Sequence, residues 1–445
     1  MTHSVLISYY IKLYLKVIKN GSIGFIFQGY FDIISYMSKK SKIHRVVIVG
    51  GGFAGIQAGL DLAKSLPKAT EICLISNKHH FEYYPRIYRV VTGANPREVC
   101  IPLAEIFKKT RVKIIYDEIN KVDLNNKNVT GKSEVNYEYD YLLLALGSET
   151  VYFNIEGVKE RSFGFKSINE ALALKKHLHK MFDVYLSSHK EDIISQLHIV
   201  VVGGGPSGVE LTGKLIAYMR VLADHHCVKN EFITIDLVEG SSNLVSTLPP
   251  EVSKKVYDRL HNLGVNIFLN RTLIKEDIDN ILMKDMTLKT NTLIWTAGSR
   301  TNHFYGSIEG LTVHKNGRVL VDEYLRPEGF ENVFIAGDSP HTPYAGLAQT
   351  AIYDGNYVAS SITRILNNRN LKKYMPKKVS YAVPVGDGWA AVAWGPLKIY
   401  GWLGFVMREM IDLIYFMSIL PPHKAIKIFL NKPLPEPCHT CQVDL

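Results

Sequence analysis

The sequence predicts an α/β protein with two parallel-sheet domains, followed by amphipathic helices at the C-terminus. One pattern, a strand, a glycine-rich turn, a helix and a second strand, occurs twice, from Arg45 and again from His198. A chain of 445 residues is long enough for both domains, and 47% hydrophobic with 21% charged residues is typical of a globular protein. This composition excludes a disordered, collagen-like or coiled-coil chain.

Residues 1–44 are predicted to be an N-terminal extension that does not span a membrane. Residues 1–36 of this extension are rich in aromatic and apolar residues, but Lys12, Lys16, Lys19 and Asp32 interrupt any run long enough to cross a bilayer. Two interpretations stay open. These three lysines share one helical face, which suits a helix in a membrane interface. Alternatively the start is mis-assigned and Met37 is the natural first residue.

The first unit has the signature of a Rossmann-like dinucleotide site. A strand at 45–49 runs into Gly50-Gly51-Gly52-Phe53-Ala54-Gly55, then a helix at 56–66 and a strand at 71–76. Gly50 permits the tight turn, Gly52 lets the backbone approach a pyrophosphate, and Gly55 lets the helix pack on the strand. Ser76 and Asn77 end the second strand, where hydrogen bonds to a ribose are expected.

The second unit has the same glycine motif, formed by Gly203, Gly205 and Gly208 between a strand at 198–202 and a helix at 209–219. Glu239 ends its second strand. A carboxylate at this position accepts hydrogen bonds from both ribose hydroxyls and repels a 2′-phosphate, which favours NADH over NADPH.

Two further strings indicate that the first unit binds a flavin. Residues 139–148 read as a buried strand that leaves through a tight turn at Gly147. Asp338 follows the strand at 333–336 and Gly337, where it can accept hydrogen bonds from the sugar-alcohol chain of FAD. We therefore expect FAD at the first unit and NADH at the second.

With these strings in view, the chain resembles the type II NADH:quinone oxidoreductases, single-subunit flavoproteins of the pyridine nucleotide-disulfide oxidoreductase superfamily. The resemblance runs from about residue 45 to 430. It includes the stretch HHFEYYPRIYRVVTG and the strings GVELTGKL, LIWTAGS and AQTAIYDG. In the last string Tyr353 stands where the family usually has a second glutamine.

The resemblance implies roles for particular residues. It places Glu210 near the nicotinamide and flavin rings, and Gln349 and Tyr353 on the quinone side of the flavin. The further cofactor contacts that it implies are Pro85, Ala145 and Ala348 for FAD, and Pro206, Ser207, Ala297 and Gly298 for NADH.

The C-terminal segment carries apolar stripes. In residues 402–420 the charged side chains of Arg408, Glu409 and Asp412 cluster on one narrow helical face, and apolar side chains cover the rest. Residues 423–432 again separate polar from apolar side chains in this way. Mid-segment charges argue against spanning and favour a helix lying on a membrane surface. Packing on the protein body or in a homodimer is the alternative.

Charge and cysteine content limit the other possibilities. The net charge of +10 is concentrated at the two ends of the chain, which suits an anionic membrane surface better than nucleic acid. The five cysteines are too scattered for a disulfide framework, and the pair Cys438 and Cys441 is only half a zinc site. We expect no metal and no nucleic-acid partner.

We thus expect an FAD-binding domain at 45–155 and 306–370, an NADH-binding domain at 156–305 and a membrane-associating segment at 371–445. The expected activity is transfer of two electrons from NADH through FAD to a quinone without proton pumping, on the cytoplasmic face of a cell membrane or on the inner mitochondrial membrane. The alternatives are a soluble ferredoxin-type reductase and a flavoprotein resembling apoptosis-inducing factor with a structural or signalling role.

Overall fold

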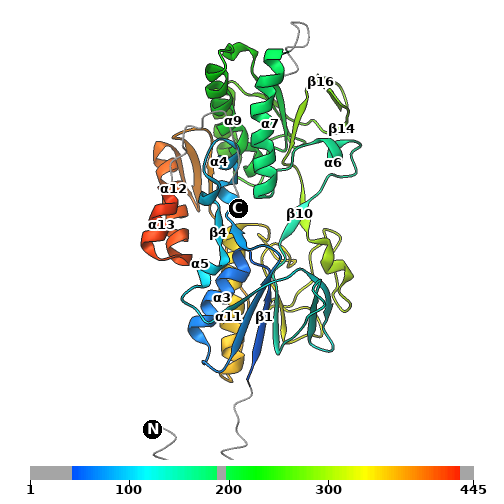
Figure 1. The fold of residues 1–445 in the computed structure, drawn as a ribbon, viewed down its shortest axis with the longest axis vertical. Coiled ribbons are helices and arrows are strands. Elements are labelled where there is room, and N and C mark those ends of the chain that lie inside the picture. The colour runs from blue at the N-terminus through cyan, green and yellow to red at the C-terminus, as the bar shows by residue number, and fades with distance from the viewer. Residues whose placement is uncertain (1–42, 188–196, 431–445) are drawn as a thin grey trace, which may run out of the picture.

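The computed structural model describes residues 43–187 and 197–430 (Figure 1). The expectations for residues 1–42, Cys438 and Cys441 lie outside the described residues.

The first glycine-rich unit belongs to a parallel sheet of strand order β19-β9-β1-β2-β5. Its strands are β1 (Arg45–Val49), β2 (Glu71–Ser76), β5 (Lys113–Tyr116), β9 (Tyr141–Leu144) and β19 (Val333–Ile335). Both faces of β1 and β9 are covered, which explains their continuous runs of Val, Ile and Leu. Because β19 pairs with β9, with Val333 opposite Leu142, residues far apart in sequence complete one sheet.

Helices α3 (Phe53–Ser65) and α11 (Ala348–Leu366) lie side by side against this sheet (Figure 1). They approach so closely that a Cβ at Gly355 would stand 2.4 Å from the carbonyl oxygen of Ala54. A glycine is therefore required where α11 crosses the first turn of α3.

The second unit forms a separate parallel sheet of order β13-β12-β11-β17, in the upper half of Figure 1. Its strands are β11 (His198–Val202), β12 (Thr234–Val238), β13 (Asn266–Phe268) and β17 (Thr292–Trp295). The associated helices are α7 (Ile168–Ser187), α9 (Pro206–His225) and α10 (Pro250–Leu263). Helix α9 is longer than the predicted range 209–219 and continues into the polar stretch that follows it.

Shorter elements connect and cover these sheets. The strands are β3 (His80–Glu82), β4 (Cys100–Pro102), β6 (Ile119–Asp123), β7 (Asn128–Gly131), β8 (Asn136–Glu138), β10 (Ser148–Thr150), β14 (Leu273–Glu276), β15 (Asn280–Met283), β16 (Thr287–Lys289) and β18 (Ser299–Thr301). The helices are α4 (Ile87–Val91), α5 (Leu103–Phe107), α6 (Val158–Arg161) and the 3₁₀ turns η1 (Tyr84–Arg86), η2 (Pro96–Glu98), η3 (Asn230–Phe232) and η4 (His303–Ser307).

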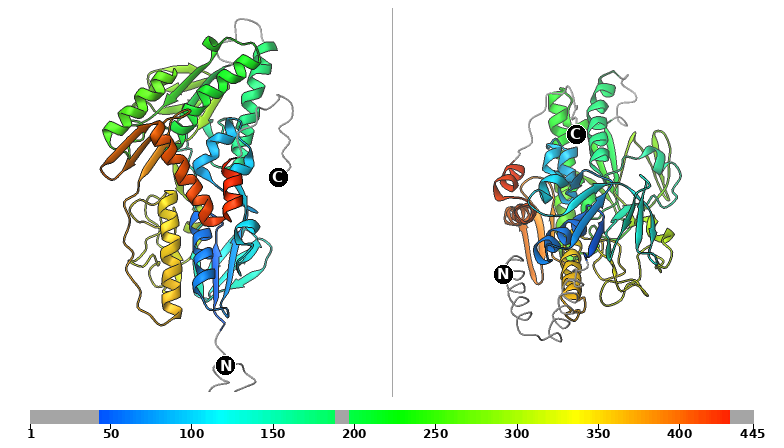
Figure 2. Two further views of the ribbon diagram at one scale, coloured as in Figure 1. Left: turned by 90° about the vertical axis from the view of Figure 1, so that its left-hand side faces the viewer. Right: turned by 60° about the horizontal axis from the view of Figure 1, so that its bottom comes forward.

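The C-terminal segment lies along the flank of the molecule (Figure 2). It comprises the antiparallel strands β20 (Tyr381–Pro384), β21 (Ala390–Trp394) and β22 (Leu397–Gly401), then α12 (Trp402–Ile419) and α13 (Pro422–Phe429). Ion pairs join it to the second unit through Lys398 and Glu251, and to α5 through Lys424 and Glu105. Within the described ranges, every helix is too short or too polar to cross a bilayer.

Candidate active site

The first glycine-rich loop leaves the N-terminus of α3 open. Gly50 has φ +117°, and a Cβ there would stand 2.2 Å from the carbonyl oxygen of Ala145. Gly52 is the N-cap of α3, with no side-chain cap and no atom within 4 Å of where its Cβ would lie. The first N–H groups of α3 thus face open space, which fits the diphosphate of a dinucleotide.

The second loop has the same construction. Gly203 has φ +113°, and a Cβ on Gly208 would stand 1.8 Å from the carbonyl oxygen of Gly203. Gly205 is an N-cap without a side-chain cap and with open space at its Cβ position, and Pro206 begins the helix with its φ already suited to it. Both glycine motifs therefore form cradles that a diphosphate fits.

Glu239 is fixed against the second loop. Its Oε2 accepts a hydrogen bond from the backbone N–H of Gly204 at 2.6 Å, and its Oε1 accepts one from Ser241 at 2.6 Å. A carboxylate oxygen can accept more than one hydrogen bond, so acceptor capacity remains for a ribose. The predicted ribose-binding carboxylate stands at the loop that it was expected to serve.

Ser76 is used differently at the first sheet. Its hydroxyl donates to the carbonyl oxygen of Lys78 at 2.9 Å and accepts from the Lys78 N–H at 3.1 Å, so it closes the turn after β2. Asn77 is exposed at the same edge. Of the two residues expected at the ribose, Asn77 has the freer side chain.

Asp338 lies beside the turns at Gly147 and Gly337, whose φ values are +69° and +87°. Its Oδ2 accepts a hydrogen bond from the Ser148 hydroxyl at 2.5 Å. Just behind it, the backbone N–H of Gly337 donates to Asp354 at 3.0 Å. The carboxyl ends of β9 and β19 thus present an acidic side chain next to the first loop, and its role toward FAD stays a prediction.

Asp354 is a buried residue that the sequence interpretation missed. The Tyr374 hydroxyl donates to its Oδ1 at 2.7 Å, and burial raises the pKa of this carboxyl to about 7. It holds the turn that presents Asp338. The signal in the sequence that could have identified Asp354 is its position in the string AQTAIYDG, immediately before the close-packed Gly355.

Glu210 lies at the start of the second turn of α9, half-buried where this helix packs against α4. Burial raises its pKa to about 8, although the charge of Arg408 acts to lower it. Glu210 also adds to the raised pKa of Tyr88, for which burial is the main cause. The second unit therefore brings a titratable carboxyl to α4, which lies between β2 and β5 in the chain of the first unit.

Gln349 and Tyr353 occupy successive turns of α11. The Gln349 amide donates to the Ser380 carbonyl oxygen at 2.9 Å and accepts from the Ser380 N–H at 3.2 Å, so it ties α11 to the chain before β20. Tyr353 is half-buried, with the Lys377 ammonium 4.3 Å from its ring centre. Their role toward a quinone stays a prediction.

The other predicted contacts lie at the carboxyl ends of the strands or close by. Phe53 and Ala54 open α3, Ala145 follows β9, Ala348 opens α11, Pro85 lies in η1, Pro206 and Ser207 open α9, and Ala297 and Gly298 follow β17.

The charged face of α12 points into the protein and forms a charge network that the sequence interpretation did not foresee. Asp412 accepts from the Nε of Arg86 at 2.6 Å and from the Tyr83 hydroxyl at 2.5 Å, and it pairs with Arg408. Glu409 pairs with Nη2 of Arg86 at 2.5 Å. The network also contains Arg89 and Glu98.

The opposite face of α12 is apolar and exposed. Trp402 is 70% exposed and Ile414 62% exposed. We name this face and its neighbours the C-terminal apolar surface; its members are Trp394, Leu397, Trp402, Leu403, Met410, Ile411, Ile414, Met417, Ile426 and Leu430. So much clustered apolar surface marks an interaction site.

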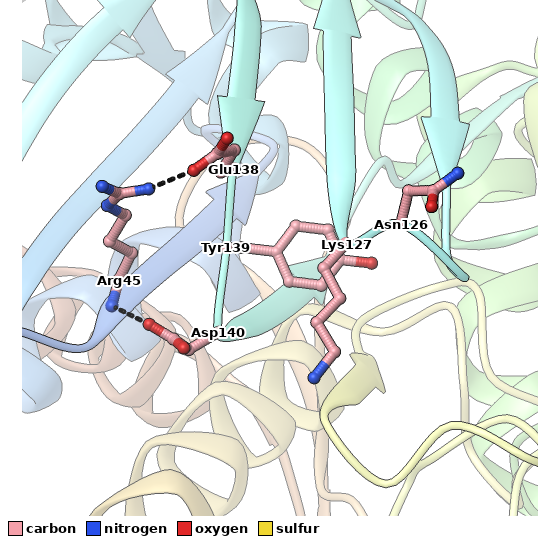
Figure 3. Close-up of a pocket in the computed structure, with 6 residues that line it drawn as sticks. All are labelled: Arg45, Asn126, Lys127, Glu138, Tyr139 and Asp140. Atoms are coloured by element: carbon pink, nitrogen blue, oxygen red, sulfur yellow. Dashed lines mark hydrogen bonds and ion pairs between the residues drawn. The ribbon is translucent and has the colours of Figure 1, made fainter. Parts of the chain in front are cut away.

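A polar pocket of about 180 Å³ lies at the other end of β1, where the strand begins (Figure 3). It is lined by Arg45, Asn126, Lys127, Glu138, Tyr139 and Asp140. In open parallel sheets ligands bind at the carboxyl ends of the strands, so this pocket is separate from both glycine loops. Among the described residues, no cluster of three or more His, Cys, Asp or Glu could hold a metal ion.

Comparison with known proteins agrees with this architecture. A "Type II NADH:quinone oxidoreductase" of Staphylococcus haemolyticus is 29% identical over 385 residues, covering 83% of this chain and 94% of the relative. Its counterpart in Staphylococcus aureus is 28% identical with the same coverage.

Solved structures share the fold. Plasmodium falciparum NDH2 in complex with NADH superposes with a TM-score of 0.78 at 19% identity, covering 88% of this chain and 97% of that one. The sulfide:quinone oxidoreductase of Aquifex aeolicus gives 0.73 at 18% identity, covering 87% and 96%. The sequence model for "Pyridine nucleotide-disulphide oxidoreductase" matches residues 44–355, and the chain therefore belongs to that family.

Proposed function

We propose that this protein is an FAD-dependent NADH:quinone oxidoreductase that works on a membrane surface without pumping protons. FAD would occupy the first glycine loop, with Asp338 toward its sugar-alcohol chain, and NADH the second loop, with Glu239 toward its ribose. The net reaction takes NADH, one proton and a quinone to NAD⁺ and a quinol. FAD supplies the hydride and electron transfer, and the protein supplies orientation and electrostatics.

The observation that carries the proposal is the meeting of the two units at Glu210. Helix α9 brings Glu210 to α4, beside Tyr88 and near Arg408 of α12. A nicotinamide bound at the N-terminus of α9 would thus lie toward the first unit, which a hydride transfer requires. The two Staphylococcus relatives are named for this reaction, the oxidation of NADH by a quinone.

Redox chemistry at a cysteine thiol has less support than electron transfer from NADH to a quinone. Cys73 and Cys100 lie in β2 and β4, and Cys227 follows α9. Burial raises the pKa of the Cys100 thiol to about 12, which keeps it protonated and unreactive at neutral pH.

The inward charges of α12 and the exposed C-terminal apolar surface support the membrane part of the proposal. Lys427 and His423 are exposed on α13, where they suit lipid headgroups. We place the protein peripherally, on the cytoplasmic face of a cell membrane or on the inner mitochondrial membrane.

Stopped-flow absorbance of the flavin tests the proposal. NADH should bleach the bound flavin rapidly, NADPH slowly, and a quinone should restore the absorbance faster than ferredoxin does. Fast reoxidation by ferredoxin alone would favour a soluble reductase, and slow reduction by NADH would favour a structural role. Enzyme on closed vesicles that contain a pH-sensitive dye should leave the internal pH unchanged during turnover.

Glu239→Gln is expected to reduce the preference for NADH over NADPH. The substitution removes the negative charge and places an amide against two backbone N–H donors. Losing a charge-assisted hydrogen bond weakens the interaction by about 1–3 kcal/mol. The ratio of kcat/KM for the two coenzymes measures the effect. Glu231→Gln, at an exposed glutamate of the same unit, should leave this ratio unchanged. An unaltered ratio in Glu239→Gln would remove Glu239 from coenzyme selection.

Glu210→Gln is expected to remove a pH-dependent step. With a pKa near 8, Glu210 is protonated at neutral pH and becomes a carboxylate beside the flavin site as the pH rises. Wild-type flavin reduction and turnover should therefore change between pH 7 and 9, whereas the variant, which is neutral at every pH, should show no change over this range.

Stability provides a second readout for Glu210. Because its folded pKa lies above the unfolded value, the stability that it contributes at low pH is lost as the pH rises toward 8. Glu210→Gln should therefore melt at a higher temperature than wild type at pH 9, but not at pH 5. Parallel pH profiles of rate and melting temperature in the two proteins would contradict this assignment.

A further inference from the structure

Lys166 links the second unit to the candidate flavin site. Its ammonium donates a hydrogen bond to the Ser148 hydroxyl at 2.9 Å, and that hydroxyl donates to Asp338 at 2.5 Å. Because the Ser148 oxygen accepts from the ammonium, its single proton is directed to Asp338. The three side chains form an ordered relay.

The backbone of Lys166 is held by the start of α7. The Ser167 hydroxyl accepts from the Glu170 N–H at 3.2 Å, and the Glu170 carboxylate accepts from the Lys166 N–H at 2.5 Å. This arrangement is a variant of the capping box, shifted by one residue. A Cβ at Gly164 would stand 2.5 Å from Glu170, so the approach to the cap is closely packed as well.

The charge of Lys166 is costly to keep at this place. Burial lowers the pKa of its ammonium, while Asp338, Glu149 and Glu170 act to raise it. A surface lysine with only a solvating role would avoid this desolvation. An ammonium held beside an acidic side chain at an anionic cofactor's site has a clear electrostatic use, because it offsets repulsion between that acid and the diphosphate.

We propose that Lys166 is an FAD-positioning residue, which acts through Ser148 to aim Asp338 at the flavin's sugar-alcohol chain and supplies positive charge beside the diphosphate. This proposal rests on the proposed role of Asp338 at the FAD site. It also makes FAD retention depend on a residue from the start of the second unit, so the two units share the cofactor site.

The dissociation constant of FAD tests this role without measuring turnover. Holoenzyme is diluted, and the fluorescence of released flavin is followed to equilibrium. Lys166→Met keeps the length of the side chain but removes its charge, and should weaken FAD binding at least tenfold. Lys166→Arg should restore most of the affinity. Lys176→Met, at an exposed lysine of α7, should bind FAD as wild type does.

Two further variants separate the possible failures. In the relay, Ser148→Ala combined with Lys166→Met should cost little more than Lys166→Met alone, because both break the same path. Asp338→Asn should itself weaken FAD binding. If Asp338→Asn weakens binding while Lys166→Met does not, the inference about Lys166 is wrong and the flavin site stands. If neither does, the role of Asp338 fails too. Equal losses in Lys166→Met and Lys166→Arg, with melting temperatures lowered equally, would indicate a structural role only and overturn the proposal.

Discussion

Asp412→Asn is expected to destabilise the protein by about 3–5 kcal/mol, because it removes the counter-charge that two buried arginines share and leaves Arg86 with Glu409 alone. The Asp412 side chain is 1% exposed and pairs with Arg86 and Arg408, and the Tyr83 hydroxyl also donates to it. An asparagine keeps the shape but offers one acceptor oxygen and no charge. Urea unfolding of the holoenzyme, followed by flavin fluorescence and circular dichroism, measures the loss.

Asp387→Asn is the matched control. Asp387 also pairs with a basic side chain, Lys214, but its own side chain is 69% exposed, so the substitution should cost well under about 1 kcal/mol. If Asp412→Asn unfolded at the same urea concentration as this control, the charge network would not be what joins α12 to the first unit. Removing α12 altogether should also disturb the first unit, since Arg86 would lose both Asp412 and Glu409.

Trp402→Glu combined with Ile414→Glu is expected to release the protein from membranes. Each side chain buried in the bilayer interface contributes about 1.5–3 kcal/mol, so losing two should weaken partitioning by more than a hundredfold. Sedimentation with vesicles that contain anionic lipid measures binding. Reduction of a long-tailed quinone in those vesicles should fall at least tenfold, while NADH oxidation with a water-soluble dye should persist.

Ile278→Glu provides the comparison, because Ile278 is also an exposed isoleucine but lies between β14 and β15, away from the C-terminal apolar surface. It should sediment with vesicles as wild type does. High salt should extract wild type only partly, since screening weakens lysine–headgroup attraction but not apolar burial. If the double variant sedimented fully and reduced long-tailed quinone at the wild-type rate, the apolar surface would be assigned to a contact between protein molecules instead.

Residues whose function depends on local backbone geometry could be found from the sequence. Gly50 and Gly203 lie in turns with positive φ, and the strands before them are buried on both faces. Each glycine motif therefore directly follows a continuous hydrophobic run, and both signals are visible in the sequence. Glu239 and Asp338 follow strands of parallel sheets, and the carboxyl ends of such strands lie at one edge. The fold class, both loops and these two acids were therefore predictable.

The orientation of α12 and the relay at Lys166 were decided only by the tertiary structure. A helical pattern shows that Arg408, Glu409 and Asp412 share a face, but not whether that face meets water or protein. The answer depends on Arg86, which lies 326 residues before Asp412 and reads in sequence as an ordinary surface arginine. Likewise, nothing near Lys166 in sequence indicates Asp338. Such contacts follow from how separate units pack, because a buried charge is stable only where distant parts of the chain supply its partner.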